Sequence, residues 1–191
     1  MERIVKINIL EVPKSIKPLL KEVPMEIHND IGRQHVLYNY VAKLFKNSVI
    51  LDIGTRHGAS AVSLKSDTNV VYTIDCRAWK DRLDFEKIGI RALIVDIAHI
   101  DEKLLKSASL IVLDVAHDGM MEIMFYRRLK QIDYKGILIL DDIHLQKYGD
   151  MEGFWQKIDL PKYDLTLVGH CTGTGMVDFS GQLQVIYHGI I

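Results

Sequence analysis

The sequence predicts a doubly wound α/β fold with a mostly parallel, seven-stranded sheet, and three observations support this. Short apolar runs rich in β-branched residues recur along the chain, as they do in a parallel sheet that is covered on both faces. The stretches between these runs have helical spacing and the lengths of crossover helices. The chain has 191 residues, of which 48% are hydrophobic, so it can bury the core of one domain.

The expected elements alternate between strand and helix. An amphipathic helix over residues 33–45 comes first, because apolar side chains recur there at helical spacing. Five parallel strands are expected at 48–53, 70–74, 92–95, 109–113 and 136–140. The helices between them are expected at 59–65, 77–88, 101–106 and 119–131. Two further strands, at 165–168 and 182–187, have no helix between them and are therefore expected to close the sheet as an antiparallel hairpin.

The expected organisation is one domain over residues 1–191, with a lead-in over 1–32 and a core over 33–188. The 24 basic and 25 acidic residues nearly balance, so no global charge attracts nucleic acid or an anionic membrane. No apolar run approaches the roughly 20 residues of a membrane span, and the N-terminus lacks the apolar core of a signal peptide. Two cysteines, Cys76 and Cys171, fit a reducing compartment. We therefore expect a cytoplasmic protein.

A loop with two glycines follows the first expected strand and leads into a helix. It reads Asp52-Ile53-Gly54-Thr55-Arg56-His57-Gly58-Ala59-Ser60. The glycines allow a sharp turn close to a ligand, and the helix start offers free N–H groups. The loop lacks the Lys-Ser/Thr of a P-loop and does not match Gly-x-Gly-x-x-Gly. It is therefore interpreted as a ligand loop, although a tight turn with no ligand is the alternative.

Aspartates follow successive expected strands. They are Asp52, Asp75, Asp96, Asp114 and the pair Asp141 and Asp142. Ligands of open α/β sheets bind outside the carboxyl ends of the strands, so these side chains are expected to outline one continuous site. Asp75 is placed to accept two hydrogen bonds from a ribose diol, and Asp96 to accept one from an adenine amino group. Trp79 could stack on the adenine or pack as a half-buried aromatic residue.

Three of these carboxylates are expected at the ends of two adjacent strands. Asp114 follows one strand, and Asp141 and Asp142 follow the next. A hard cation such as Mg²⁺ would relieve their repulsion, because it takes oxygen ligands and leaves positions for water or substrate hydroxyls. The alternative is that one member of the pair caps the following helix while Asp114 is solvated.

On these residues, the chain from about residue 33 to 188 resembles the class I methyltransferases that depend on S-adenosylmethionine (SAM). Asp52-x-Gly54-x-x-x-Gly58 is similar to their first motif, and Asp75 is similar to their ribose-binding acid. The resemblance implies SAM as the cofactor. The residues that it implies for cofactor binding are Asp52, Gly54, Thr55, Arg56, Gly58, Ser60, Asp75, Asp96, Ile97 and Asp114.

The pattern Leu113-Asp114-x-x-His117, a helix, and then Asp141-Asp142 resembles the metal-dependent O-methyltransferases, including those that methylate sugar hydroxyls. The resemblance implies that Asp114, Asp141 and Asp142 bind Mg²⁺ or Mn²⁺. It also implies a hydroxyl of a sugar, a glycan or another small polyol as the acceptor.

The catalytic base stays open at this stage. Val115-Ala116 replaces the Gly-Asp that usually follows the first aspartate in the sugar enzymes, and this departure leaves open which residue is the base. His117 is favoured as the base because the resemblance places a histidine there, and His144 is the second candidate. The stretch over 173–179 is interpreted as a glycine-rich turn rather than as a substrate-binding element.

Other function classes fit parts of the pattern. A metal-independent methyltransferase for another acceptor and an inactive SAM-binding module share the cofactor loop, although the metal-type carboxylates argue against inactivity. A nicotinamide-dependent dehydrogenase also uses a glycine loop and a ribose acid, but the missing Gly-x-Gly-x-x-Gly argues against it. Nucleic acid is not an expected partner, because the sequence has neither an Asn-Pro-Pro-Tyr-type motif nor a basic stripe.

Overall fold

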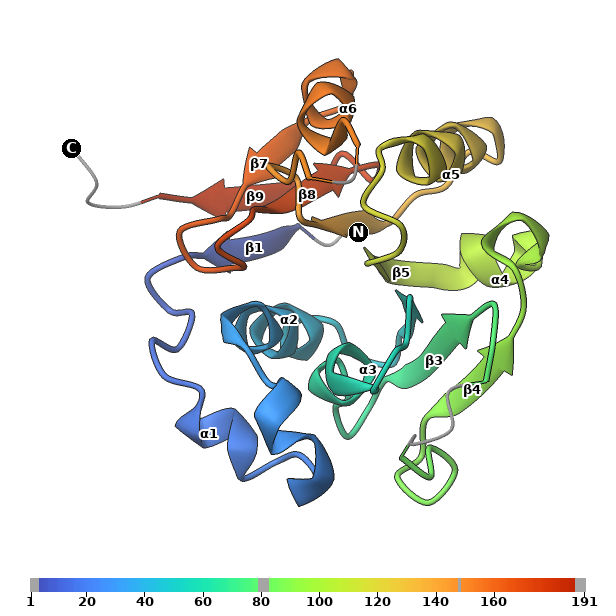
Figure 1. Ribbon diagram of the computed structural model, residues 1–191. Helices are drawn as coiled ribbons and strands as arrows, with labels where there is room; N and C mark the ends of the chain where they lie inside the picture. Colours follow the sequence, from blue (N-terminus) through green and yellow to red (C-terminus); the bar gives the residue numbers. More distant parts are fainter. Residues whose placement is uncertain (1–3, 79–82, 148, 188–191) are drawn as a thin grey trace.

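The main sheet of the computed structural model, which describes residues 4–78, 83–147 and 149–187, has seven strands in the order β4-β3-β2-β5-β6-β8-β7 (Figure 1). These are β2 (Val49–Ile53), β3 (Val70–Asp75), β4 (Arg91–Ile94), β5 (Ala108–Leu113), β6 (Ile137–Asp141), β7 (Lys162–Asp164) and β8 (Thr174–Asp178). The first five in this spatial order pair in parallel, whereas β8 runs antiparallel to both β6 and β7. The predicted fold class, a mostly parallel seven-stranded α/β sheet with antiparallel strands near the C-terminus, is confirmed.

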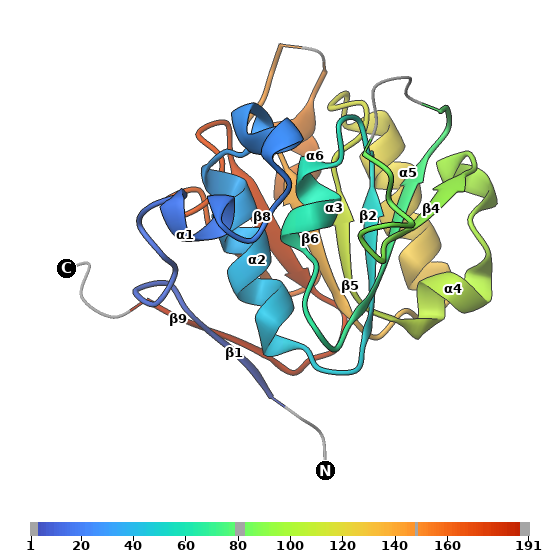
Figure 2. The same cartoon turned by 90° about the horizontal axis from the view of Figure 1, so that it is seen from below.

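Helices cover both faces of this sheet (Figure 2). The helices are α1 (Lys17–Leu20), α2 (Arg33–Leu44), α3 (Ala59–Ser63), α4 (Glu102–Ser107), α5 (Met120–Gln131) and α6 (Met151–Lys157). One core cluster joins α2 and α3 to the sheet, and the other joins α4, α5 and α6 to its opposite face. Among the described residues, no helix combines the length and the apolar character that crossing a membrane would need.

The alternation of side chains along the strands decides which way the aspartates at their ends point. In β2, Ile50 packs in the core under α2, and Leu51 packs in the opposite core. In β5 and β6 the same alternation places Val112 and Ile139 under α2. Because side chains two residues apart share a face, the side chains of Asp52, Asp114 and Asp141 all belong to the face that α2 covers. These three residues lie on β2, directly after β5 and at the end of β6.

The closing hairpin differs from its prediction. The predicted strand at 165–168 is wrong, because these residues form a turn after β7. Residues 173–179, predicted as a turn, contain β8, which is buried throughout. Gly175 lies within this strand because a Cβ there would come within 2.6 Å of the Trp155 ring, so the glycine reflects close packing rather than a turn.

The strand predicted at 182–187 exists, but it lies outside the main sheet. It is β9 (Leu183–Ile186), which pairs in parallel with β1 (Val5–Asn8), a strand of the lead-in that the sequence did not reveal. The lead-in also contains α1 and a 3-10 helix, η1 (Met25–Asp30). Helix α6 was not predicted. The helix predicted over 77–88 is not formed in residues 83–88, most of which make a turn, while 79–82 lie outside the described residues.

Candidate functional site

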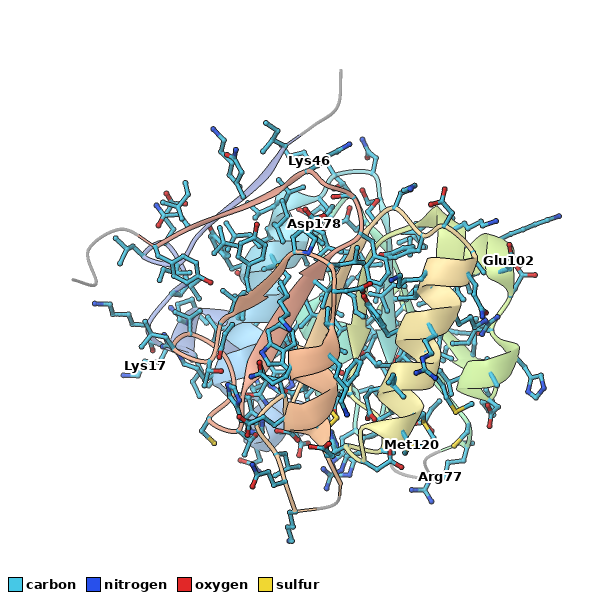
Figure 3. The ribbon with its side chains drawn as sticks, turned by 90° about the horizontal axis from the view of Figure 1, so that it is seen from above. Lys17, Lys46, Arg77, Glu102, Met120 and Asp178 are labelled. Atoms are coloured by element: carbon cyan, nitrogen blue, oxygen red, sulfur yellow. The ribbon has the colours of Figure 1, made fainter. Side chains whose placement is uncertain are left out.

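A pocket of about 440 Å³ opens where the carboxyl ends of β2, β3, β4 and β5 meet. This is the point where the strand order reverses, which is the usual place for ligands in open α/β sheets. Arg77, on its rim, and Met120, at the start of α5, lie at one end of the molecule, opposite Lys46 (Figure 3). Six residues predicted to bind the cofactor line the pocket: Gly54, Arg56, Asp75, Asp96, Ile97 and Asp114.

The remaining predicted cofactor residues, Asp52, Thr55, Gly58 and Ser60, do not line the pocket but stabilise the loop that does. Asp52 is completely buried, and its Oδ2 accepts a hydrogen bond of 2.6 Å from the Thr73 hydroxyl. Thr73 Oγ1 in turn lies 2.6 Å from Thr55 Oγ1. Ser60 is also buried, and Gly58 has a φ of +91° and faces Phe85. These residues hold the shape of the loop, whereas the pocket itself is lined by their neighbours.

Burial raises the pKa of Asp52 to about 6, although hydrogen bonds from Thr73 and Ser60 oppose the shift. Because the pKa is higher in the folded chain than in the unfolded one, the unfolded chain loses this proton first as the pH rises. Stability should therefore fall between about pH 4 and 6, by about 3 kcal/mol for this one group. Asp52→Asn should remove this part of the pH dependence, which urea unfolding at several pH values measures. An unchanged slope in the variant would contradict the assignment.

Backbone N–H groups hold the Asp75 carboxylate at the end of β3. Its Oδ2 accepts from Arg56 N, and its Oδ1 accepts from Arg77 N, each at 3.3 Å. Asp96 accepts from Ala98 N at 2.8 Å, so it caps the 3-10 helix η2 (Ile97–His99). Both carboxylates line the pocket, and their contacts with a ribose and an adenine stay predictions. Trp79, the predicted stacking residue, lies outside the described residues.

The carboxylate cluster, defined as Asp114, Asp141 and Asp142, adjoins the pocket at the ends of β5 and β6. His117 bridges two of its members: Nε2 lies 3.2 Å from Asp114 Oδ1, and Nδ1 lies 3.3 Å from Asp142 Oδ2. His170, which was not predicted, lies on the other side, with its Nδ1 2.8 Å from Asp142 Oδ1 and 3.5 Å from Asp141 Oδ1.

The electrostatics of the cluster reflect crowded negative charge. Burial, followed by the charges of Asp141, Asp52 and Asp142, raises the pKa of Asp114 well above its usual range. The neighbouring carboxylates of Asp141 and Asp142 raise the pKa of His170 to about 10, so without a cation its imidazolium supplies positive charge to the cluster, and a bound cation would displace its proton. Burial works against the ionised form of Asp142, but hydrogen bonds from His170 and Thr172 keep the pKa of Asp142 below its usual value.

The donor set fits a divalent cation. Ligand atoms of Asp141, Asp142 and His170 all lie within 4.8 Å of one another. Asp141 Oδ1 is buried and has no hydrogen-bond partner among the described residues, so one strong acceptor is left for a ligand. Two carboxylates and an imidazole suit Mn²⁺ or a related transition metal at least as well as Mg²⁺. The predicted ligand Asp114 adjoins this group but does not belong to it, and instead contacts His117.

Backbone strain is concentrated at the site. Among the described residues, five that are not glycine have a positive φ, and three of these are Arg56, His117 and Asp142. A positive φ is uncommon outside glycine and persists only where the surroundings enforce it. The strain is consistent with a functional demand on the orientation of these three side chains.

His144, the second predicted base, is engaged elsewhere. Its Nε2 lies 2.8 Å from Asp164 Oδ2 on β7, and its backbone N–H donates to Thr172 O. A role as a base would require the contact with Asp164 to break. His170 escaped prediction because it follows a turn after β7 that the sequence suggested was a strand, so no pattern placed it opposite Asp142.

Three methyltransferase structures share this architecture. The first, methyltransferase PaMTH1 of Podospora anserina with bound S-adenosylhomocysteine (SAH), is 15% identical and superposes with a TM-score of 0.56 over 76% of this chain and 77% of that chain. An rRNA methylase from Streptococcus thermophilus is 13% identical and gives 0.54 over 81% and 99%. The chain has the methyltransferase fold. Coclaurine N-methyltransferase bound to N-methylheliamine and SAH is 15% identical and gives 0.53 over 86% and 63%. By sequence, no protein-family model and no curated protein matches the chain.

Proposed function

We propose that the protein is a SAM-dependent O-methyltransferase that acts on a hydroxyl of a sugar, a glycan or another small polyol with the help of a divalent metal. One observation carries the proposal. Asp114, a member of the carboxylate cluster, and His117, which contacts it, both line the pocket at the switch point of the sheet, and the cluster fits a cation. A cofactor site and a site for activating a hydroxyl are therefore adjacent.

Each part of the pocket suits one part of SAM. Asp75, held by the N–H groups of Arg56 and Arg77, would accept hydrogen bonds from the ribose diol. Asp96 and the Ile97 backbone would face the adenine. Gly54 lets the loop lie close to the backbone of Asp114, since its φ is +104° and any Cβ would strike the Asp114 carbonyl. SAM bound in this pocket supplies the methyl group as an electrophile.

The carboxylate cluster would orient and activate the acceptor. A cation held by Asp141, Asp142 and His170, with Asp114 beside them, would lower the pKa of an acceptor hydroxyl. His117, whose ring is held between Asp114 and Asp142, would receive the hydroxyl proton on Nε2, which requires its 3.2 Å contact with Asp114 to break. The near-neutral composition of the chain favours a small-molecule or glycan acceptor over nucleic acid. Cys76 and Cys171 are unpaired thiols, which fits the expected cytoplasmic location.

The test of the cofactor is calorimetry with SAH. We expect binding by the wild-type chain, and Asp75→Ala should weaken it by about 1–3 kcal/mol because the ribose loses its acceptor. Asp67→Ala, which changes an exposed aspartate outside the pocket, is the control and should bind as the wild type does. Equal affinity of the Asp75 variant would refute the ribose contact. Binding of NAD instead of SAH would replace the proposal with a dehydrogenase.

A further inference from the structure

Tyr38 and Tyr134 are both almost fully buried, with exposed fractions of 1% and 2%. The hydroxyl of Tyr134 donates to Ile137 O at 3.1 Å. The hydroxyl of Tyr38 has no hydrogen-bond partner among the described residues. A buried hydroxyl that has left water without finding a partner is costly, and such groups are rare in native proteins. A buried Tyr38 hydroxyl without a hydrogen bond therefore indicates a function that offsets its cost in stability.

Tyr38 lies on α2, above the face of the sheet to which Asp52, Asp114 and Asp141 belong. The charges of these aspartates and of Asp142 act on its hydroxyl, and that of Asp141 acts most strongly. Burial first, and these charges second, raise the pKa of Tyr38 well above its usual value. The hydroxyl is therefore neutral and able to donate a hydrogen bond toward the carboxylates.

Asp141 supplies the matching acceptor. Its Oδ1 is also buried and has no hydrogen-bond partner in the described part of the chain, and His170 Nδ1 approaches it only to 3.5 Å. A donor that lacks an acceptor thus lies on the same side of the sheet as an acceptor that lacks a donor. Carboxylates that bind metals commonly accept hydrogen bonds from such outer partners, which fix the orientation of the ligand.

We propose that Tyr38 is a positioning residue of the metal site. Its hydroxyl, which has no hydrogen-bond partner among the described residues, donates to the Asp141 carboxylate when a divalent cation is bound. This inference rests on the proposed function, because it requires a metal at the carboxylate cluster. The inference gives α2, the helix before the cofactor loop, a role in orienting Asp141, the proposed metal-binding residue at the end of β6.

Tyr134→Phe is the matched control for Tyr38→Phe, because the two variants lose the same atom from equally buried rings. Without metal, Tyr134→Phe should lower the Tm by roughly 2–4 °C, since it breaks a hydrogen bond. Tyr38→Phe should leave the Tm unchanged or raise it. The affinity for Mn²⁺ is measured from the paramagnetic resonance signal of the free ion. Tyr38→Phe should weaken this affinity by about tenfold or more, whereas Tyr134→Phe should leave it unchanged.

Each of the other possible outcomes contradicts either the inference about Tyr38 or the proposed function. A lower Tm for metal-free Tyr38→Phe would show that the hydroxyl is already bonded in the free protein and would overturn the inference. Wild-type Mn²⁺ affinity in Tyr38→Phe would overturn it too, but would leave the metal site standing. If the wild-type chain binds no Mn²⁺, the metal part of the proposed function fails and the inference fails with it. SAH binding, measured separately, decides the rest of the proposed function.

Discussion

Asp141→Asn is expected to reduce methyl transfer at least about a hundredfold while SAH binding stays near the wild-type value. Asp141 is buried at the end of β6, where its Oδ1 has no hydrogen-bond partner among the described residues, and it does not line the pocket proposed for the cofactor. The substitution therefore removes a charge from the proposed metal site and leaves the residues around the cofactor in place. The measurement is turnover with a polyol acceptor, found by screening sugars and catechols, together with calorimetry of SAH.

The matched control is Asp164→Asn, since Asp164 is an aspartate on β7 that pairs with His144 outside the cluster. It should retain turnover. EDTA should abolish the activity of the wild-type enzyme, and Mn²⁺ or Mg²⁺ should restore it. Full activity in EDTA, together with an active Asp141→Asn variant, would reject the metal and leave His117 as a metal-free base.

Gly54→Ala is expected to destabilise the fold by about 3–5 kcal/mol, through two separate effects. Gly54 has a φ of +104°, which side chains rarely adopt, and a Cβ there would lie 1.7 Å from the Asp114 carbonyl oxygen. The clash falls on backbone, which cannot move aside as a flexible side chain can. Denaturant unfolding of the variant and the wild type measures the difference.

Gly181→Ala separates the two effects. Gly181 has a φ of +70°, but a Cβ there would meet no described atom within 4 Å, so only the conformational cost of about 1 kcal/mol applies. The excess destabilisation of Gly54→Ala over Gly181→Ala is then the cost of the clash with the Asp114 backbone directly after β5. If the two variants are equally mild, the close approach of Gly54 and Asp114 is wrong.

The parallel half of the fold could be predicted because each buried strand is a continuous apolar run. Ile137–Asp141, for example, is buried at every position and ends at an acidic residue. The aspartates at the strand ends were recognisable for the same reason, since parallel strands end at the same edge of a sheet. Six of the predicted cofactor residues consequently line one pocket, although whether they bind SAM stays a prediction.

The closing strands could not be predicted, because their signals depend on packing from distant parts of the chain. Thr174–Asp178 contains a glycine that fits under Trp155, which local spacing reads as a turn. His170 approaches Asp142 across 28 residues, and no periodicity links the two. Tyr38 has the helical spacing of an ordinary core residue, and what distinguishes it is a hydroxyl with no hydrogen-bond partner among the described residues.

The pairing of β1 with β9 has a consequence for the order in which the chain is made. Val5 pairs with Leu183, and Asn8 pairs with Ile186, so β1 is synthesised long before its partner exists. During translation the α/β core can form while β1 still exposes unpaired N–H and C=O groups, an edge that invites association with other chains. Closing so large a loop is also entropically costly. Docking of β1 is therefore expected to be a late event, possible only after residues 183–186 have left the ribosome.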